Sequence, residues 1–161
     1  MGANLYIRTI HEALCEKYRP LLNEAIRKRD SLPQDSKEAA EAQEEVERYF
    51  RLMRSEGYFR DPYKISSMLA TLELTWWGDV ASLCNERGEL KGESLKRFRE
   101  MVAGAKQHLP SKKEFGKDHG QVNHNGNGLS EWHKHFIDKR MKLLAFLDHA
   151  IELDTAIDCS L

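Results

Sequence analysis

Residues 65–84, ISSMLATLELTWWGDVASLC, decide the fold that this sequence predicts. The stretch carries only two charged residues, Glu73 and Asp79, in a chain in which 32% of residues are charged. At 100° per residue its apolar side chains form one wide stripe, and the remaining face carries only small residues. A helix without a charged face is normally buried. We therefore expect a central buried helix near 62–84.

Four further segments show the apolar spacing of amphipathic helices: 4–30, 36–57, 93–108 and 131–155. Pro20 lies inside the first of them and predicts a kink or a break there. No strand-like alternation and no internal repeat is visible. The sequence therefore predicts an all-α fold, a single-domain bundle of four to five helices over residues 1–161. Residues 109–129 lack periodicity, and we expect a flexible or functional loop there.

Composition narrows the class of protein. The chain has 161 residues, of which 40% are hydrophobic, enough for the core of one domain. Its net charge of -1 makes nucleic acid an unlikely partner, although acids gather in 35–47 and bases in 91–117. No apolar leader and no long uncharged apolar run is present, so we expect no membrane association. Three widely spaced cysteines are typical of reduced thiols and a cytoplasmic protein.

Three charged residues interrupt apolar helix faces: Glu73 and Asp79 in the central stretch, and Arg140 in the last helix. Because an unpaired buried charge is costly, we expect Arg140 to reach Asp79 or Glu73 as an interhelical ion pair. The alternative is a small-molecule pocket. Its candidate lining residues are Trp76, Trp77, Glu73, Asp79 and Arg140.

Four histidines lie close together in the sequence: His119, His124, His133 and His135. Imidazole nitrogens are common ligands of zinc, so a loop leading into a helix could gather them around a divalent metal. On a regular helix, however, His133 and His135 are about 200° apart, and they converge only if the first turn is frayed. The opposing interpretation is a set of exposed polar side chains. We expect no cofactor, with zinc as the alternative.

Motifs for common chemistries are missing from the sequence, which has no Gly-rich phosphate loop, no GxSxG and no HExxH. Nucleotide hydrolysis and common acyl-transfer chemistry are therefore disfavoured. We expect a non-enzymatic cytosolic binding protein whose partner is another protein or a second copy of itself, with a small-molecule ligand as a further option. The alternative is a metal-dependent enzyme that uses the histidines of 119–135.

Overall fold

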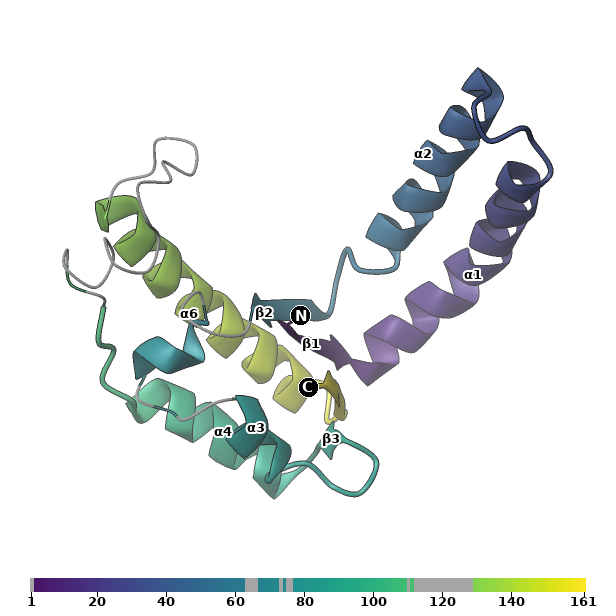
Figure 1. Ribbon diagram of the computed structural model, residues 1–161. Helices are drawn as coiled ribbons and strands as arrows, with labels where there is room; N and C mark the ends of the chain where they lie inside the picture. The colour runs from purple at the N-terminus through teal and green to yellow at the C-terminus, as the bar shows by residue number, and fades with distance from the viewer. Residues whose placement is uncertain (1, 63–66, 73, 75–76, 110, 112–128) are drawn as a thin grey trace. The chain divides into compact units, whose positions relative to one another are not determined.

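The protein is an α+β structure, so the all-α prediction is wrong. The computed structural model describes residues 2–62, 67–72, 74, 77–109, 111 and 129–161. Four strands form one antiparallel sheet in the order β2-β1-β4-β3 (Figure 1). Their bounds are β1 Gly2–Ile7, β2 Tyr58–Pro62, β3 Glu89–Leu90 and β4 Ile157–Ser160.

Strand β1 shows why the sheet escaped prediction. Its odd-numbered residues Ala3, Leu5 and Ile7 are buried, and the residues between them are partly exposed. This alternation places one face of a strand against the core. The alternation covers only three apolar positions. Because Ile7 also fits the apolar stripe of the helix that follows, the strand pattern and the helix pattern overlap at this residue.

The predicted central helix at 62–84 is also wrong. The region contains the end of β2, a 3-10 helix η2 at Leu69–Leu72, and a short helix α3 at Trp77–Ala81. The apolar character of the stretch did predict burial, because Met68, Leu69, Leu72 and Val80 are buried. A run that is apolar on all sides indicates burial without specifying its secondary structure.

Helical periodicity identified the four long helices. They are α1 Arg8–Asp30, α2 Lys37–Leu52, α4 Glu93–Gly104 and α6 Leu129–Glu152. Helix α1 runs through Pro20 without a break. Ser36 caps α2, because its hydroxyl oxygen accepts the Ala39 N–H at 3.1 Å. None of the described helices has the length and hydrophobicity required to cross a bilayer.

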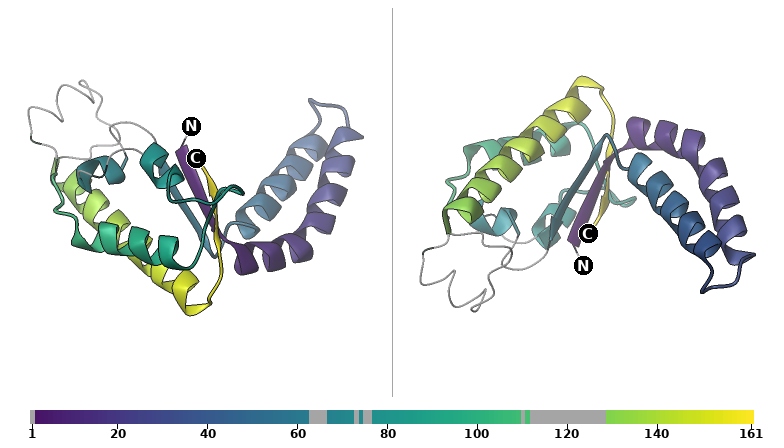
Figure 2. Two further views of the ribbon diagram at one scale, coloured as in Figure 1. Left: turned by 90° about the horizontal axis from the view of Figure 1, so that it is seen from below. Right: turned by 90° about the horizontal axis from the view of Figure 1, so that it is seen from above.

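The chain divides into two compact units. The first comprises Met1–Leu5 and Phe59–Leu161, and in it α4 and α6 cover one face of the sheet (Figure 2). Its largest fully buried side chains come from the sheet, from η2 with Met68, and from both helices. They are Leu5, Met68, Leu69, Leu72, Leu90, Leu95, Phe98, Phe136, Leu143 and Leu147. The expectation of a single domain over 1–161 stays a prediction.

The second unit, Tyr6–Tyr58, is the hairpin of α1 and α2. The two helices pack along one seam of buried residues. These are Cys15, Leu22, Ala25, Val46 and Met53, with Tyr18, Ile26 and Tyr49 partly buried beside them. At the open end of the hairpin the Ile7 N–H donates to the Gly57 carbonyl at 2.8 Å.

Candidate functional site

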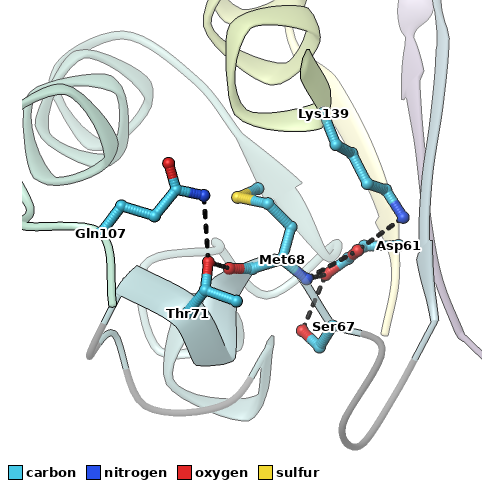
Figure 3. A network of polar contacts seen from close by, with 6 residues as sticks. All are labelled: Asp61, Ser67, Met68, Thr71, Gln107 and Lys139. Atoms are coloured by element: carbon cyan, nitrogen blue, oxygen red, sulfur yellow. Dashed lines mark hydrogen bonds and ion pairs between the residues drawn. The ribbon is translucent and has the colours of Figure 1, made fainter. Parts of the chain in front are cut away.

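The most strongly constrained polar group in the first unit is the carboxylate of Asp61, in β2. Asp61 has no solvent exposure, and its Oδ1 lies 2.8 Å from Nζ of Lys139, on α6 (Figure 3). The Lys139 side chain is 13% exposed, and its ammonium also lies 6.0 Å from the centre of the Phe59 ring. A buried carboxylate requires a positive partner, and α6 supplies it.

Asp61 also organises the segment that leads into η2. The Ser67 hydroxyl donates to Asp61 Oδ2 at 2.8 Å. The Met68 N–H lies 3.0 Å from both carboxylate oxygens. In the sequence, Asp61 directly precedes the predicted helix near 62–84. In the structure, it accepts a backbone N–H seven residues along the chain, across a connection rather than within one helical turn.

Thr71 continues this network toward the segment after α4. Its hydroxyl donates to the Met68 carbonyl at 2.7 Å and accepts the Gln107 side-chain amide at 3.2 Å (Figure 3). The His108 N–H donates to the Thr71 carbonyl. Among the described residues, no buried side-chain nitrogen or oxygen lacks a hydrogen-bond partner. The network therefore holds β2, η2, α6 and residues 107–108 together, and its carboxylate is already saturated with donors.

His135 lies one turn before Lys139 on α6. Its ring packs against Trp132, with 5.7 Å between ring centres. His135 is an exposed residue, but partial desolvation of its ring lowers its pKa, the positive charge of Lys139 lowers that pKa further, and the Asp61 carboxylate acts in the opposite direction. His135 therefore favours its neutral form.

The structure leaves the predicted small-molecule pocket untested. Glu73 and Trp76 lie outside the described residues. Trp77 and Asp79 belong to α3, and the structure describes only their backbone. The pocket and the ion pairs of Arg140 with Asp79 or Glu73 stay predictions.

Arg140 itself caps helix α4. Its Nη2 donates to three backbone carbonyls at the end of that helix, those of Val102 at 2.9 Å, Ala103 at 3.1 Å and Ala105 at 2.7 Å. The last carbonyls of a helix have no partner within the helix, and a guanidinium can satisfy several of them. The apolar residues beside Arg140 on α6 thus belong to the face of α6 that packs against α4.

The regular geometry of α6 separates two of the four histidines that were predicted to bind a metal. Helix α6 is continuous from Leu129, so His133 and His135 diverge by about 200° around its axis. His119 and His124 lie outside the described residues. Within the ranges that are described, no group of three or more His, Cys, Asp or Glu side chains could hold a metal ion. The zinc hypothesis stays a prediction, which metal analysis of the purified protein will test.

The hairpin presents the other candidate surface. Leu21 on α1 and Phe50 on α2 are 42% and 43% exposed. Phe50 lines a shallow hollow with Glu47, Arg51 and Arg54. Three of the six acids that the sequence gathers in 35–47 pair with bases of the same hairpin. These ion pairs are Lys28–Glu45 at 3.8 Å, Lys37–Glu41 at 3.6 Å and Arg51–Glu47 at 3.9 Å.

Sequence reasoning missed Asp61, Ser67 and Lys139 as a group. Asp61 and Lys139 lie on elements that are far apart in the chain, and no motif links them. The only available signal was an acid followed by proline at the start of an apolar stretch, which also resembles a helix cap.

Comparisons of the chain with protein-family models, with curated proteins and with solved structures yield no match. The function is therefore inferred from the contacts described above.

Proposed function

We propose that this protein is a non-enzymatic binding protein that recognises a second copy of itself through the α1–α2 hairpin. The observation that carries the proposal is the exposure of Leu21 and Phe50, large apolar side chains on the two helices of the hairpin. Each helix of the hairpin thus offers a large apolar side chain that a second copy could cover.

The narrow seam of the hairpin supports the same proposal. The buried residues of α2 are Ala39, Ala42 and Val46, two of which are small. Pro20 also removes one backbone hydrogen bond from α1, and a proline in a helix interior typically costs about 3 kcal/mol. Most helical stability in proteins comes from packing an apolar face. A second hairpin would supply such packing in a four-helix arrangement.

Charge does not oppose this association. Because Glu41, Glu45 and Glu47 already pair with bases of their own hairpin, the repulsion between the acidic segments of two copies is reduced. Two of the three basic residues of α4 also have partners within the first unit: Lys96 pairs with Glu93, and Arg99 pairs with Asp148 on α6. We therefore expect apolar packing to provide the affinity between the two copies, rather than ion pairs between the acidic segment 35–47 and the basic segment 91–117.

Sedimentation velocity over a range of protein concentrations tests the proposal. We expect the wild-type chain to dimerise and the double variant Leu21→Ser/Phe50→Ser to remain a monomer with unchanged helix content. A matched control is Ile137→Ser/Met141→Ser, which removes exposed apolar side chains from α6 and should leave the dimer intact. A wild-type chain that stays monomeric at every concentration contradicts the proposal.

A further inference from the structure

A column of polar side chains runs along one side of α1. His11, Cys15, Arg19 and Asn23 follow one another at a spacing of four residues, and helical residues four apart lie on the same face. All of them line one open hollow of about 570 Å³. The hollow lies entirely within the second unit, on a single helix.

The thiol of Cys15 contacts the imidazole of His11. The Cys15 sulfur lies 3.4 Å from Nε2 and 3.9 Å from Nδ1. When the imidazole carries its proton on Nδ1, the thiol donates to Nε2. The ring of His11 packs in turn against the ring of Tyr6, with 4.4 Å between ring centres. A nucleophile, a base within reach of its proton and a group that orients the base are the parts of an activated nucleophile.

Arg19 lies one helical turn after Cys15 in the same hollow. The Cα–Cβ bonds of a helix tilt toward its N-terminus, so the guanidinium can reach back over the hollow toward Cys15. Its N–H groups can donate to a carbonyl oxygen of a bound molecule and stabilise negative charge that develops on that oxygen.

The charges around the hollow disfavour anions. Glu12 and Glu16 also line it, so two carboxylates face one guanidinium. An anionic molecule meets repulsion from both acids, whereas a small neutral molecule does not. The hollow therefore favours an uncharged compound whose carbonyl oxygen can accept hydrogen bonds from Arg19.

We propose that Cys15 is a covalent modification site for small neutral α,β-unsaturated carbonyl compounds, with His11 as the base and Arg19 as the donor to the carbonyl oxygen. The modification goes beyond self-association and does not require it, because all three side chains belong to one helix of one chain.

The reaction is an addition in which nothing leaves. His11 Nε2 takes the thiol proton, and the Cys15 sulfur attacks the β-carbon of the compound. The C–S bond forms as the C=C π bond breaks, and the electron pair moves to the carbonyl oxygen, where Arg19 stabilises the enolate. The protonated imidazole then returns its proton to the α-carbon. The product is a thioether, and no oxidant or reductant takes part.

The other two cysteines have no such base among their hydrogen-bond partners in the described part of the chain. The Cys84 thiol donates to the Val80 carbonyl at 3.6 Å, and the Cys159 thiol donates to the Ile157 carbonyl at 3.7 Å. A carbonyl oxygen cannot take the proton away, and burial raises the pKa of both thiols. Cys15 is only 8% exposed, whereas the other two are partly exposed. Accessibility alone therefore predicts that Cys15 reacts last, and the proposal predicts that it reacts first.

Limited labelling of the full chain with N-ethylmaleimide at neutral pH, followed by peptide mapping, measures this order. We expect Cys15 to react about tenfold or more faster than Cys84 and Cys159. In urea the three thiols should react at similar rates, and folding should slow Cys84 and Cys159 without slowing Cys15.

His11→Gln tests the base. It should slow the labelling of Cys15 at neutral pH by about tenfold or more and have a smaller effect at alkaline pH, where hydroxide ionises the thiol without help. The rates of Cys84 and Cys159 should be unchanged, which also shows that the variant is folded.

Arg19→Gln tests the donor to the carbonyl oxygen. It should slow the reaction with N-ethylmaleimide several-fold and leave the reaction with iodoacetamide nearly unchanged, because iodoacetamide loses iodide and places no charge on its carbonyl oxygen. Arg27→Gln, at another exposed position of α1, is the matched control and should change neither rate.

Labelling of Cys84 or Cys159 before Cys15 in the wild-type chain would overturn the proposal, as would protection of Cys15 by folding. An unchanged rate in a folded His11→Gln variant would exclude the base, and equal effects of Arg19→Gln on both reagents would exclude the donor. If His11→Gln does not fold, the labelling order of the wild-type chain and its comparison with urea still decide.

Discussion

Lys139 and Asp61 form an ion pair that joins α6 to β2, with 2.8 Å between Nζ and Oδ1. Because Asp61 has no solvent exposure, removing the ammonium leaves a buried carboxylate without its positive partner. We expect Lys139→Met to lower the free energy of unfolding by about 3 kcal/mol, measured by urea denaturation.

The exposed Lys142, on the same helix, provides the control for this change. Lys142→Met should alter stability by less than about 0.5 kcal/mol. In the double variant Asp61→Asn/Lys139→Met the charge is removed along with its partner, so the loss should be smaller than the sum of the two single losses. Equal effects of Lys139→Met and Lys142→Met would contradict the structural importance of the ion pair.

His135 makes stability depend on pH. Its folded-state pKa lies below the usual value of about 6.5, chiefly through burial, so the unfolded chain binds the proton more readily. Stability should be complete above this unfolded-state pKa and should decrease as the pH falls from there through the folded-state pKa. We expect His135→Gln to flatten this part of the curve in urea denaturation at neutral and mildly acidic pH.

The charged neighbours of His135 allow an NMR titration of the imidazole to test the cause. Lys139 lowers the pKa of His135 more than Lys142 does. Lys139→Met should therefore raise this pKa further than Lys142→Met, and neither should restore it fully, because burial remains. A larger rise with Lys142→Met would be incompatible with the placement of His135 beside Lys139.

Gly57 closes the base of the hairpin in a conformation that other residues rarely adopt. Its φ is +60°, and a Cβ there would lie 2.9 Å from the Cβ of Ile10. Gly57→Ala should therefore destabilise the protein by about 1–3 kcal/mol in urea denaturation. Gly104, at the end of α4, has open space around a Cβ, so Gly104→Ala should be neutral or stabilising. Similar losses at both positions would count against the assigned turn.

Arg140 is expected to stabilise the end of α4 through its three carbonyl contacts. Arg140→Met should lower the free energy of unfolding by about 1–3 kcal/mol, because hydrogen bonds from a charged donor are lost. Arg140→Lys should recover only part of this loss, since an ammonium lacks the planar fork of donors. Arg97→Met, at an exposed position of α4, is the control and should have little effect. An unchanged stability of Arg140→Met would exclude the capping role.

The long helices could be predicted from the sequence, whereas the sheet and its buried ion pair could not. Helical periodicity is local, and it recurs over enough turns in α1, α2, α4 and α6 to be recognised. The strands are short, and β4 repeats no pattern long enough to distinguish it from the end of α6. From the sequence, Asp61 resembles a helix cap because a proline follows it. Its partner Lys139 lies on α6, an element distant in the chain, so no local pattern links the two residues.

Two further contacts also could not be predicted from the sequence. The sequence predicts Arg140 to be a charge within an apolar face, but its acceptors are backbone carbonyls at the end of α4, which no side-chain pattern indicates. The hydrogen bond from the Cys159 N–H to the Gly88 carbonyl likewise depends on the β3–β4 pairing. Contacts of this kind follow from topology, and the topology was hidden by the weak strand signals.

The strand order β2-β1-β4-β3 places the first strand of the chain next to the last. During synthesis β1 emerges first, yet one of its two neighbours becomes available only when Ile157–Ser160 have left the ribosome. The α1–α2 hairpin depends on contacts between neighbouring segments and can form early, whereas joining β1 to β4 requires closing nearly the whole chain into one loop. We therefore expect sheet completion to be a late step of folding, and until then β1 has an unpaired edge that other nascent chains can reach.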